Sequence, residues 1–188
     1  MTVFPAPIID FTVLDSIGCG PFTVDFANLS SPQNNEDTAS MNFWWVVDND
    51  TLGYNSAFQY TFDAIIGDTV DYHVTLFGQT IHGCINSADM VISVIPEPIA
   101  ELNLDSVPMY CAPLQIDTLG VMALSYITAQ SNDSIFWQVI DPSGLTLVTG
   151  TGLDCPSYII TDQNDYVWVV LIAYNDCGLD QDLSLIHI

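Results

Sequence analysis

The chain has 188 residues and a formal charge of −23, because it contains 23 Asp and Glu residues and neither Lys nor Arg. Without cationic side chains it cannot neutralise phosphates, which excludes nucleic acids and anionic lipid surfaces as partners. Apolar residues make up 49% of the chain, which excludes a disordered protein. The longest apolar run, Val167 to Tyr174, is far shorter than the about 20 residues of a membrane-spanning helix. The missing Lys and Arg fit either a compositional bias of the lineage or of a saline habitat, or selection for protease resistance or for cation-dependent assembly.

The first half of the chain reads as short strands separated by turns. Apolar residues alternate with other residues, as in strands with one buried face. Gly, Pro, Asn and Asp cluster between the runs, as in turns. No stretch keeps helical spacing for three turns, so we expect an all-β fold. The alternating runs lie at 8–13, 22–26, 43–47, 60–62, 72–76 and 90–94.

Pro96-Glu97-Pro98 marks the boundary between two predicted domains, 1–96 and 97–188. Two prolines favour an extended, semi-rigid link, which predicts domains joined end to end. The second half carries the same kind of strand pattern, and seven short strands are typical of a sandwich. The terminal run 182–188 falls on a strand position but resembles a translated sequencing adapter, which leaves open a truncation of the second domain. The uncharged start, Met1 to Phe4, does not resemble a signal peptide, so either the signal lies elsewhere or the chain is a piece of a longer one. The earlier Pro5-x-Pro7, which echoes Pro96-x-Pro98, favours a piece.

The two halves are copies of one module. The heptapeptide 19–25 has a counterpart at residues 111–117, which is 92 positions later. Its Cys, its Pro, two alternate apolar residues and its final Asp recur there. The same step carries Trp45 onto Trp137. A repeat of this kind predicts two domains with the same fold, each with its Trp in the hydrophobic core. Tyr72 and Tyr166 open corresponding strands and are candidates for tyrosine corners.

Four of the five cysteines occupy matched places in the two copies. Cys19 and Cys84 are 65 positions apart, and Cys111 and Cys177 are 66 apart. We therefore expect one disulfide in each module, Cys19–Cys84 and Cys111–Cys177, each worth about 4 kcal/mol in the chain-entropy model; the alternative is free buried thiols. Cys155 is left over as an unpaired thiol that can exchange with a neighbour or bond another chain. The absence of a Cys-x-x-Cys motif and the scarcity of His argue against zinc.

The order of these motifs resembles a known family. Cys-x-Pro before an alternating run, Trp after an aromatic residue, Tyr60-Thr61-Phe62, the Tyr72–Leu76 run and Gly83-Cys84 resemble the polycystic-kidney-disease (PKD) domain. They are most similar to the tandem versions in giant surface proteins of gliding, type IX-secreting bacteria. The likeness covers nearly the whole chain and is weaker in the second copy. The family's Trp-Asp-Phe-Gly-Asp-Gly loop is present only as the altered segment 45–50.

The resemblance implies the fold class and the function. The fold would be two tandem immunoglobulin-like (PKD-type) β-sandwiches joined end to end. The module would act outside the cell, at the cell surface, as a non-catalytic spacer of a stalk, filament or adhesin. The alternative is a ligand- or carbohydrate-binding adhesion module. Expected partners are neighbouring copies of the chain, further repeats of the same chain, and surface glycans.

Two patterns are candidates for modification and for metal binding. Asp followed by Ser or Thr occurs seven times and resembles the O-glycosylation signal of the same bacteria; the alternative is a turn Asp that leads into a strand. Pairs of Asp in loops are weak candidates for Ca²⁺ ligands, and the alternative is solvated turn residues. The candidate hydroxyls are Ser16, Thr38, Thr51, Thr69, Ser106, Thr118 and Ser134. The candidate metal ligands are Asp48, Asp50, Asp162 and Asp165.

The sequence offers no candidate for catalysis. His73, His82 and His187 lie in or beside predicted strands and outside any nucleophile motif. The many carboxylates make any single pair uninformative, and no phosphate-binding glycine loop occurs. We therefore expect no enzyme activity and no cofactor apart from the candidate Ca²⁺. Edge strands are the expected surfaces of polymerisation unless they are blocked, and in a chain without Lys only Pro, Asp or a glycan could block them.

Overall fold

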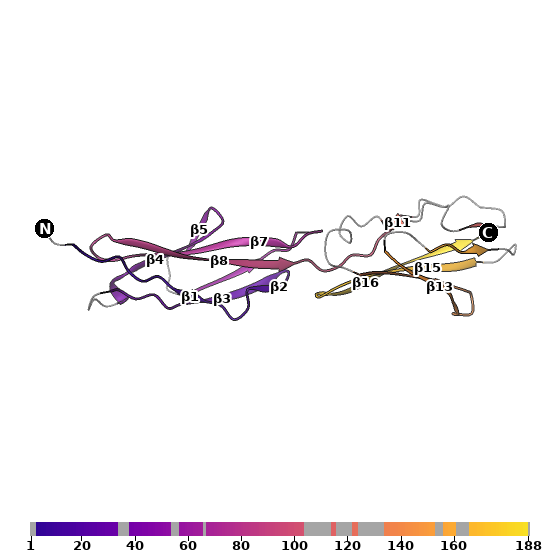
Figure 1. Cartoon of the computed structure of the whole chain (residues 1–188), viewed down its shortest axis with the longest axis horizontal. Coiled ribbons are helices and arrows are strands. Elements are labelled where there is room, and N and C mark those ends of the chain that lie inside the picture. The colour runs from indigo at the N-terminus through magenta and orange to yellow at the C-terminus, as the bar shows by residue number, and fades with distance from the viewer. Residues whose placement is uncertain are drawn as a thin grey trace. The chain divides into compact units, whose positions relative to one another are not determined.

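The computed structural model describes residues 3–33, 38–53, 57–65, 67–103, 114–115, 122–123, 134–152, 156–160 and 166–187. In these residues the chain forms strands and one short 3₁₀ turn, η1 (Thr38–Ser40). None of their helical turns is long and apolar enough to cross a membrane. The chain divides into two compact units, and Figure 1 shows the strands of each. The first unit is Met1–Ala64 with Thr69–Ile95, and the second is Pro96–Ile188 with Ile65–Asp68.

The first unit is a sandwich of two sheets. All strand pairs are antiparallel except that between β2 and β8, which is parallel. The three-stranded sheet has the order β1 (Phe11–Thr12), β3 (Phe22–Asn28), β6 (Ala57–Phe62). The five-stranded sheet has the order β2 (Ile17–Cys19), β8 (Ile85–Ile95), β7 (Val70–Gln79), β4 (Asn42–Val47), β5 (Asp50–Gly53).

The core of the first unit is built around Trp45. Its side chain is 0% exposed, and its ring centroid lies 5.1 Å from that of Phe11, 5.3 Å from Phe26 and 5.2 Å from Phe58. Alternation along β4 places Trp45 inside, because every second side chain of a strand points to the same face. Replacing such a side chain by Ala costs about 3–5 kcal/mol, so this Trp is a main support of the unit.

The second unit repeats the larger sheet. Its four-stranded sheet has the order β13 (Thr146–Thr151), β12 (Ser134–Ile140), β15 (Tyr166–Asn175), β16 (Gly178–His187). Two short pairs complete the described part: β10 (Leu114–Gln115) with β14 (Ile159–Ile160), and β9 (Leu102–Asn103) with β11 (Met122–Ala123). Trp137 is 0% exposed in a core that also contains Ile160 of β14. Its indole Nε1–H donates to Gly152 O at 2.8 Å.

The all-β, immunoglobulin-like sandwich predicted from the sequence is confirmed. The two Trp residues that the repeat aligns occupy equivalent places, because β4 lies between β5 and β7 as β12 lies between β13 and β15. One strand boundary was wrong. The alternating runs 72–76 and 90–94 predicted a longer turn between them, whereas the β7–β8 ladder runs from Val70↔Val94 to Gln79↔Ile85. Backbone pairing continues there through polar residues that carry no apolar alternation.

Candidate functional site

The predicted bond Cys19–Cys84 is wrong. Cys84 has a free thiol, whereas Cys19 is disulfide-bonded. Cys19 pairs with Ile95 at the last residue of β8, and Cys84 precedes Ile85 at its first residue. A strand of eleven residues separates the two ends by roughly 33 Å, far beyond the about 4.4–6.8 Å between the Cα atoms of a cystine. The repeat in the sequence thus suggested the wrong partner for Cys19, because Cys19 and Cys84 lie at opposite ends of the long strand β8.

The second cysteine pair is only half described. Cys177 is disulfide-bonded and sits in the β15–β16 turn, where its N–H donates to Asn175 Oδ1 at 2.7 Å. The Asn175 amide in turn donates to Pro96 O at 2.8 Å, which ties this turn to the start of the unit. Cys111 and Cys155 lie outside the described residues. Because Cys19 and Cys177 are disulfide-bonded and Cys84 is free, the bond Cys111–Cys177 and an unpaired Cys155 cannot both hold within one chain, and each stays a prediction.

Tyr72 forms the expected tyrosine corner. Its hydroxyl donates to Asp63 O at 2.7 Å across the β6–β7 connection. Burial, followed by the charges of Asp63, Tyr60 and Asp48, raises the pKa of the Tyr72 hydroxyl above its ordinary value of 10.0. The neutral hydroxyl is therefore the form that fits the folded unit. For Tyr166 the preceding residues 161–165 lie outside the described part, so its corner stays a prediction.

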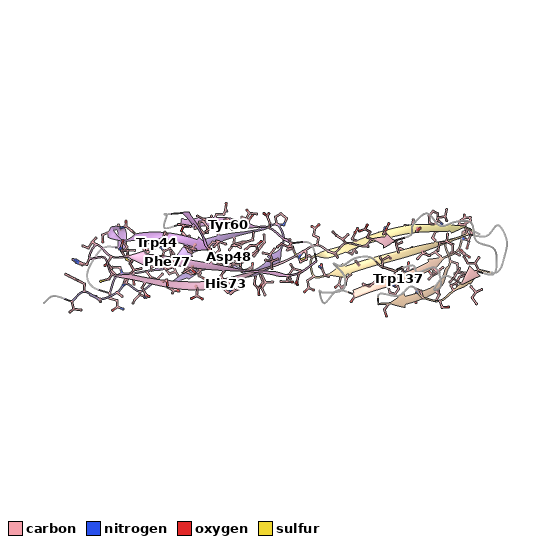
Figure 2. All side chains as sticks on the ribbon, turned by 90° about the horizontal axis from the view of Figure 1, so that it is seen from above. Trp44, Asp48, Tyr60, His73, Phe77 and Trp137 are labelled. Atoms are coloured by element: carbon pink, nitrogen blue, oxygen red, sulfur yellow. The ribbon has the colours of Figure 1, made fainter. Side chains whose placement is uncertain are left out.

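Asp48, a candidate metal ligand, is used by the backbone instead. It has a left-handed φ of 52°, which Asp tolerates better than most residues. Its N–H donates to His73 O at 2.7 Å, and its carboxylate accepts the His73 N–H at 3.0 Å. Both residues are labelled in Figure 2. The carboxylate thus extends the β4–β7 ladder by one step. Asp50 begins β5.

No metal centre is formed by the part of the chain that the structure describes: it holds no group of three His, Cys, Asp or Glu side chains suited to an ion. Asp162 and Asp165 lie outside that part. The Ca²⁺ hypothesis therefore stays a prediction for their loop, and Asp48 is already engaged by hydrogen bonds to the backbone.

The candidate glycosylation hydroxyls lie mostly at the surface. Thr38, Thr51, Thr69 and Ser134 are exposed, and Ser16 is half-buried. Ser106 and Thr118 fall outside the described residues. A sugar could reach the exposed hydroxyls without disturbing a core, and whether it is attached stays a prediction.

An aromatic pair that the sequence analysis missed lies on the outer face of the five-stranded sheet. Trp44 and Phe77 are direct cross-strand partners on β4 and β7. Their rings stack with centroids 5.2 Å apart and planes inclined by 3°. Both residues are labelled in Figure 2. Both are half-buried, and their neighbours Trp45 and Leu76 point into the core. The sequence signal that could have revealed this pair is the presence of two adjacent apolar residues in each strand, because one residue of each such pair must face outward.

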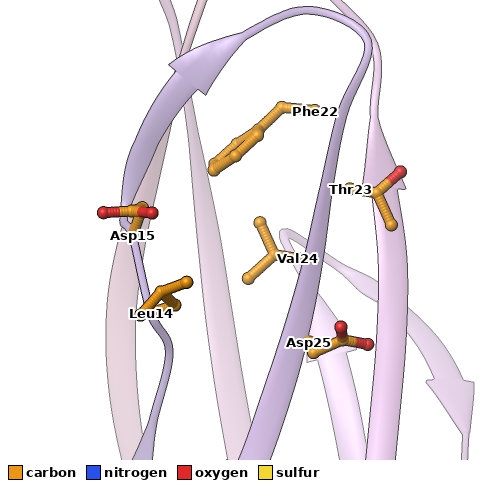
Figure 3. Close-up of a pocket in the computed structure, with 6 residues that line it drawn as sticks. All are labelled: Leu14, Asp15, Phe22, Thr23, Val24 and Asp25. Atoms are coloured by element: carbon orange, nitrogen blue, oxygen red, sulfur yellow. The ribbon is translucent and has the colours of Figure 1, made fainter.

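A shallow pocket of about 120 Å³ opens beside β3 (Figure 3). Leu14 and Asp15 form one side of it, and Leu14 is 95% exposed. Phe22, Thr23, Val24 and Asp25 form the other side. Ligand sites usually measure about 300–1,000 Å³, so this hollow is too small for a typical ligand. Its two carboxylates alone do not form a catalytic arrangement.

The comparisons with known proteins give distant structural likeness only. No protein-family model matches the chain, and no curated protein matches it. The chain is similar to the three N-terminal domains of the bacteriophage RB49 highly immunogenic outer capsid protein (Hoc), at 10% identity and a TM-score of 0.44, over 95% of this chain and 68% of that one. It is also similar to the fibronectin(III)-like modules of Clostridium thermocellum CbhA, at 12% identity and a TM-score of 0.34, over 95% of this chain and 94% of that one. Likenesses of this size carry no argument about function.

Proposed function

We propose that the chain is a non-catalytic structural module of an extracellular stalk, filament or adhesin, made of two PKD-type domains at 1–96 and 97–188. Its partners would be neighbouring copies of itself or further repeats of the same chain. Support comes from the repeated sheet, since each unit places the same kind of strand pair around one fully buried Trp. The disulfide-bonded Cys19 and Cys177 support an oxidising location, because disulfides persist mainly outside the cytosol.

The observation that carries the proposal is the parallel pairing of β2 with β8. Ile17 pairs with Ser93 and Cys19 with Ile95. Flanking bonds run from Ser93 N to Ser16 O at 2.8 Å and from Gly20 N to Ile95 O at 2.9 Å. A pull on the two ends of the unit drives these strands past each other in opposite directions. All their bonds are then strained at once rather than one after another, as a module under tension requires.

The test is single-molecule pulling of the chain in reducing buffer, which opens the disulfides. The variant Ser93→Pro removes the N–H that bonds Ser16 O, and Ser93→Ala is its matched control. The control loses only the hydroxyl that donates to Asp71 Oδ1 at 2.6 Å. We expect Ser93→Pro to lower the unfolding force of the first unit and Ser93→Ala to leave it near wild type. Equal forces for all three chains would refute the force-bearing role.

The aromatic pair Trp44–Phe77 favours a second candidate function, the binding of carbohydrate by an adhesion module. The C–H faces of sugar rings pack well against accessible aromatic rings, and this half-buried pair lies on the outer face of the five-stranded sheet. Titration with neutral soluble polysaccharides, followed by tryptophan fluorescence, tests this idea. Saturable binding that Trp44→Ala abolishes supports it, and no binding at any concentration removes it.

A further inference from the structure

The four-stranded sheet of the second unit has an apolar face turned away from its core. On β15 the residues Val167, Val169, Leu171 and Ala173 lie in the core cluster, so the alternate residues point outward. Cross-strand register joins Phe136 to Ile172 and Tyr174 to Leu179. We call the following set the outer patch: Phe136, Trp168, Val170, Ile172, Tyr174 and Leu179.

The outer patch is dense yet open to solvent. Val170 is only 7% exposed although it does not belong to the core cluster, so its neighbours on the outer face must cover it. Tyr174 is 53% exposed and Leu179 is 67% exposed. Large contiguous apolar patches are rare on the surfaces of soluble proteins, and those that occur usually mark interaction sites.

Charge is kept away from this face. The other described side chains on it, such as Ser134, Gln138 and Gln181, are uncharged. On β16 the acids alternate to the opposite side: Asp180 Oδ2 accepts the Ala100 N–H at 2.9 Å, and Asp182 Oδ2 accepts the Leu102 N–H at 2.7 Å.

The corresponding face of the first unit differs in charge. The alternation of β7 and β8 puts Asp71, His73 and Asp89 on its outer face. In a chain of charge −23, the uncharged face of the second unit is therefore a distinct feature and not a general property of the two sheets.

We propose that the outer patch is the contact through which two copies of this chain associate, sheet face against sheet face about a two-fold axis. Two copies of such an acidic chain repel each other, and they come together at least cost where neither presents a carboxylate. A flat sheet face can also meet its own copy, as sheets do in sandwiches. The inference deepens the proposed function by naming the surface through which copies of the module meet.

The size of the face fits a weak dimer. From Tyr166 to Tyr174, β15 spans roughly 27 Å, and four strands are roughly 19 Å wide. Two such faces would bury on the order of 1,000 Å², which is the lower limit for a specific interface. The carboxylates around the patch still repel, so added salt should strengthen the association by screening them. An interface between opposite charges would respond to salt in the reverse way.

The test is sedimentation velocity of the full chain at roughly 1 to 100 µM, in about 0.05 M and about 0.5 M NaCl, with free thiols blocked. The variant Tyr174→Asp places a charge on the outer patch. Its matched control is Ile159→Asp, since Ile159 is 51% exposed on the other sheet of the same unit, against 53% for Tyr174. Near-ultraviolet circular dichroism checks that both variants fold, and Leu179→Asn replaces Tyr174→Asp if that variant does not fold.

We expect wild type and Ile159→Asp to dimerise, more strongly at high salt, and the patch variant to raise the dimer Kd at least about tenfold. A monomeric wild type, an unchanged Kd in the patch variant, or association that weakens with salt would each overturn the inference. None of these outcomes affects the pulling experiment, so failure here is distinguishable from failure of the proposed function.

Discussion

The tyrosine corner of the first unit allows a sharp test of how its loops are held. The change Tyr72→Phe removes one hydroxyl and keeps the ring, which lies 5.0 Å from the ring of Phe62. What is lost is the hydrogen bond to Asp63 O, which measures 2.7 Å. The perturbation therefore isolates a single polar contact between the end of β6 and the start of β7.

The expected magnitude follows from the environment of that bond. A neutral hydrogen bond contributes about 0.5–1.5 kcal/mol net, and this one is partly open to solvent, so we expect a loss of about 1 kcal/mol. For a domain of this size such a loss lowers Tm by roughly 4–8 °C. Urea and thermal unfolding of the first unit, followed by tryptophan fluorescence, measure it.

The matched control is Tyr60→Phe. The ring of Tyr60 packs against Phe62 at 4.7 Å, and no hydrogen bond from its hydroxyl is found among the residues that the structure describes. This change should therefore cost less than about 0.5 kcal/mol. Equal losses for Tyr60→Phe and Tyr72→Phe would refute the reasoning, because the same atom would then matter equally with and without a partner.

The pKa of Tyr72 adds a pH dependence to the same test. Because the folded-state pKa is raised above 10.0, the neutral hydroxyl stabilises the fold. This contribution is fully present below the ordinary pKa and is lost as the pH rises through the folded-state pKa. The stability difference between wild type and Tyr72→Phe should therefore shrink in alkaline buffer, and a difference that grew there would contradict the assignment.

Three further experiments test other parts of the structure. Asp141→Ala should lower the Tm of the second unit near neutral pH more than Asp141→Asn, since Asp141 Oδ1 accepts hydrogen bonds from Ser143 Oγ, Ser143 N and Leu145 N. The Ser143 hydroxyl and then the Leu145 N–H lower the pKa of Asp141 below its ordinary 3.8, so this stabilisation is present above that value and should vanish as the pH falls through the folded-state pKa. Maleimide labelling of the native chain with peptide mapping should modify Cys84 and spare Cys19 and Cys177; labelled Cys19 would contradict its disulfide. Intact mass of natively expressed protein should exceed that of the bare polypeptide if the Asp-Ser and Asp-Thr hydroxyls carry sugars, and a bare mass would remove that hypothesis.

The strands and their buried faces could be predicted because side-chain alternation is local. Trp45 and Trp137 were placed in cores by spacing alone, and both are 0% exposed. Tyr72 could be placed because its strand follows a polar turn. In each case the information lies within a few residues of the side chain concerned.

The cysteine pairing could not be predicted because it depends on strand length and direction. The matched spacing of the cysteines in the two copies suggested that Cys19 and Cys84 are neighbours. The strand β8 is long, however, and Cys19 and Cys84 lie at its opposite ends. The roles of Trp44 and Asp48 were also hidden. One depends on which of two adjacent aromatics faces outward, and the other on a carboxylate that substitutes for a backbone acceptor of His73.

The most direct measurement of the central claim compares two pulling directions on one molecule, a variant that keeps Cys84 as its only cysteine. Pulling from the N- and C-termini strains the β2–β8 bonds together. Pulling from the N-terminus and Cys84, whose Sγ lies 3.6 Å from Phe4 O, leaves those bonds out of the direct path of force. The account predicts a clearly higher unfolding force for the first unit between the termini. The same force in both directions would contradict it.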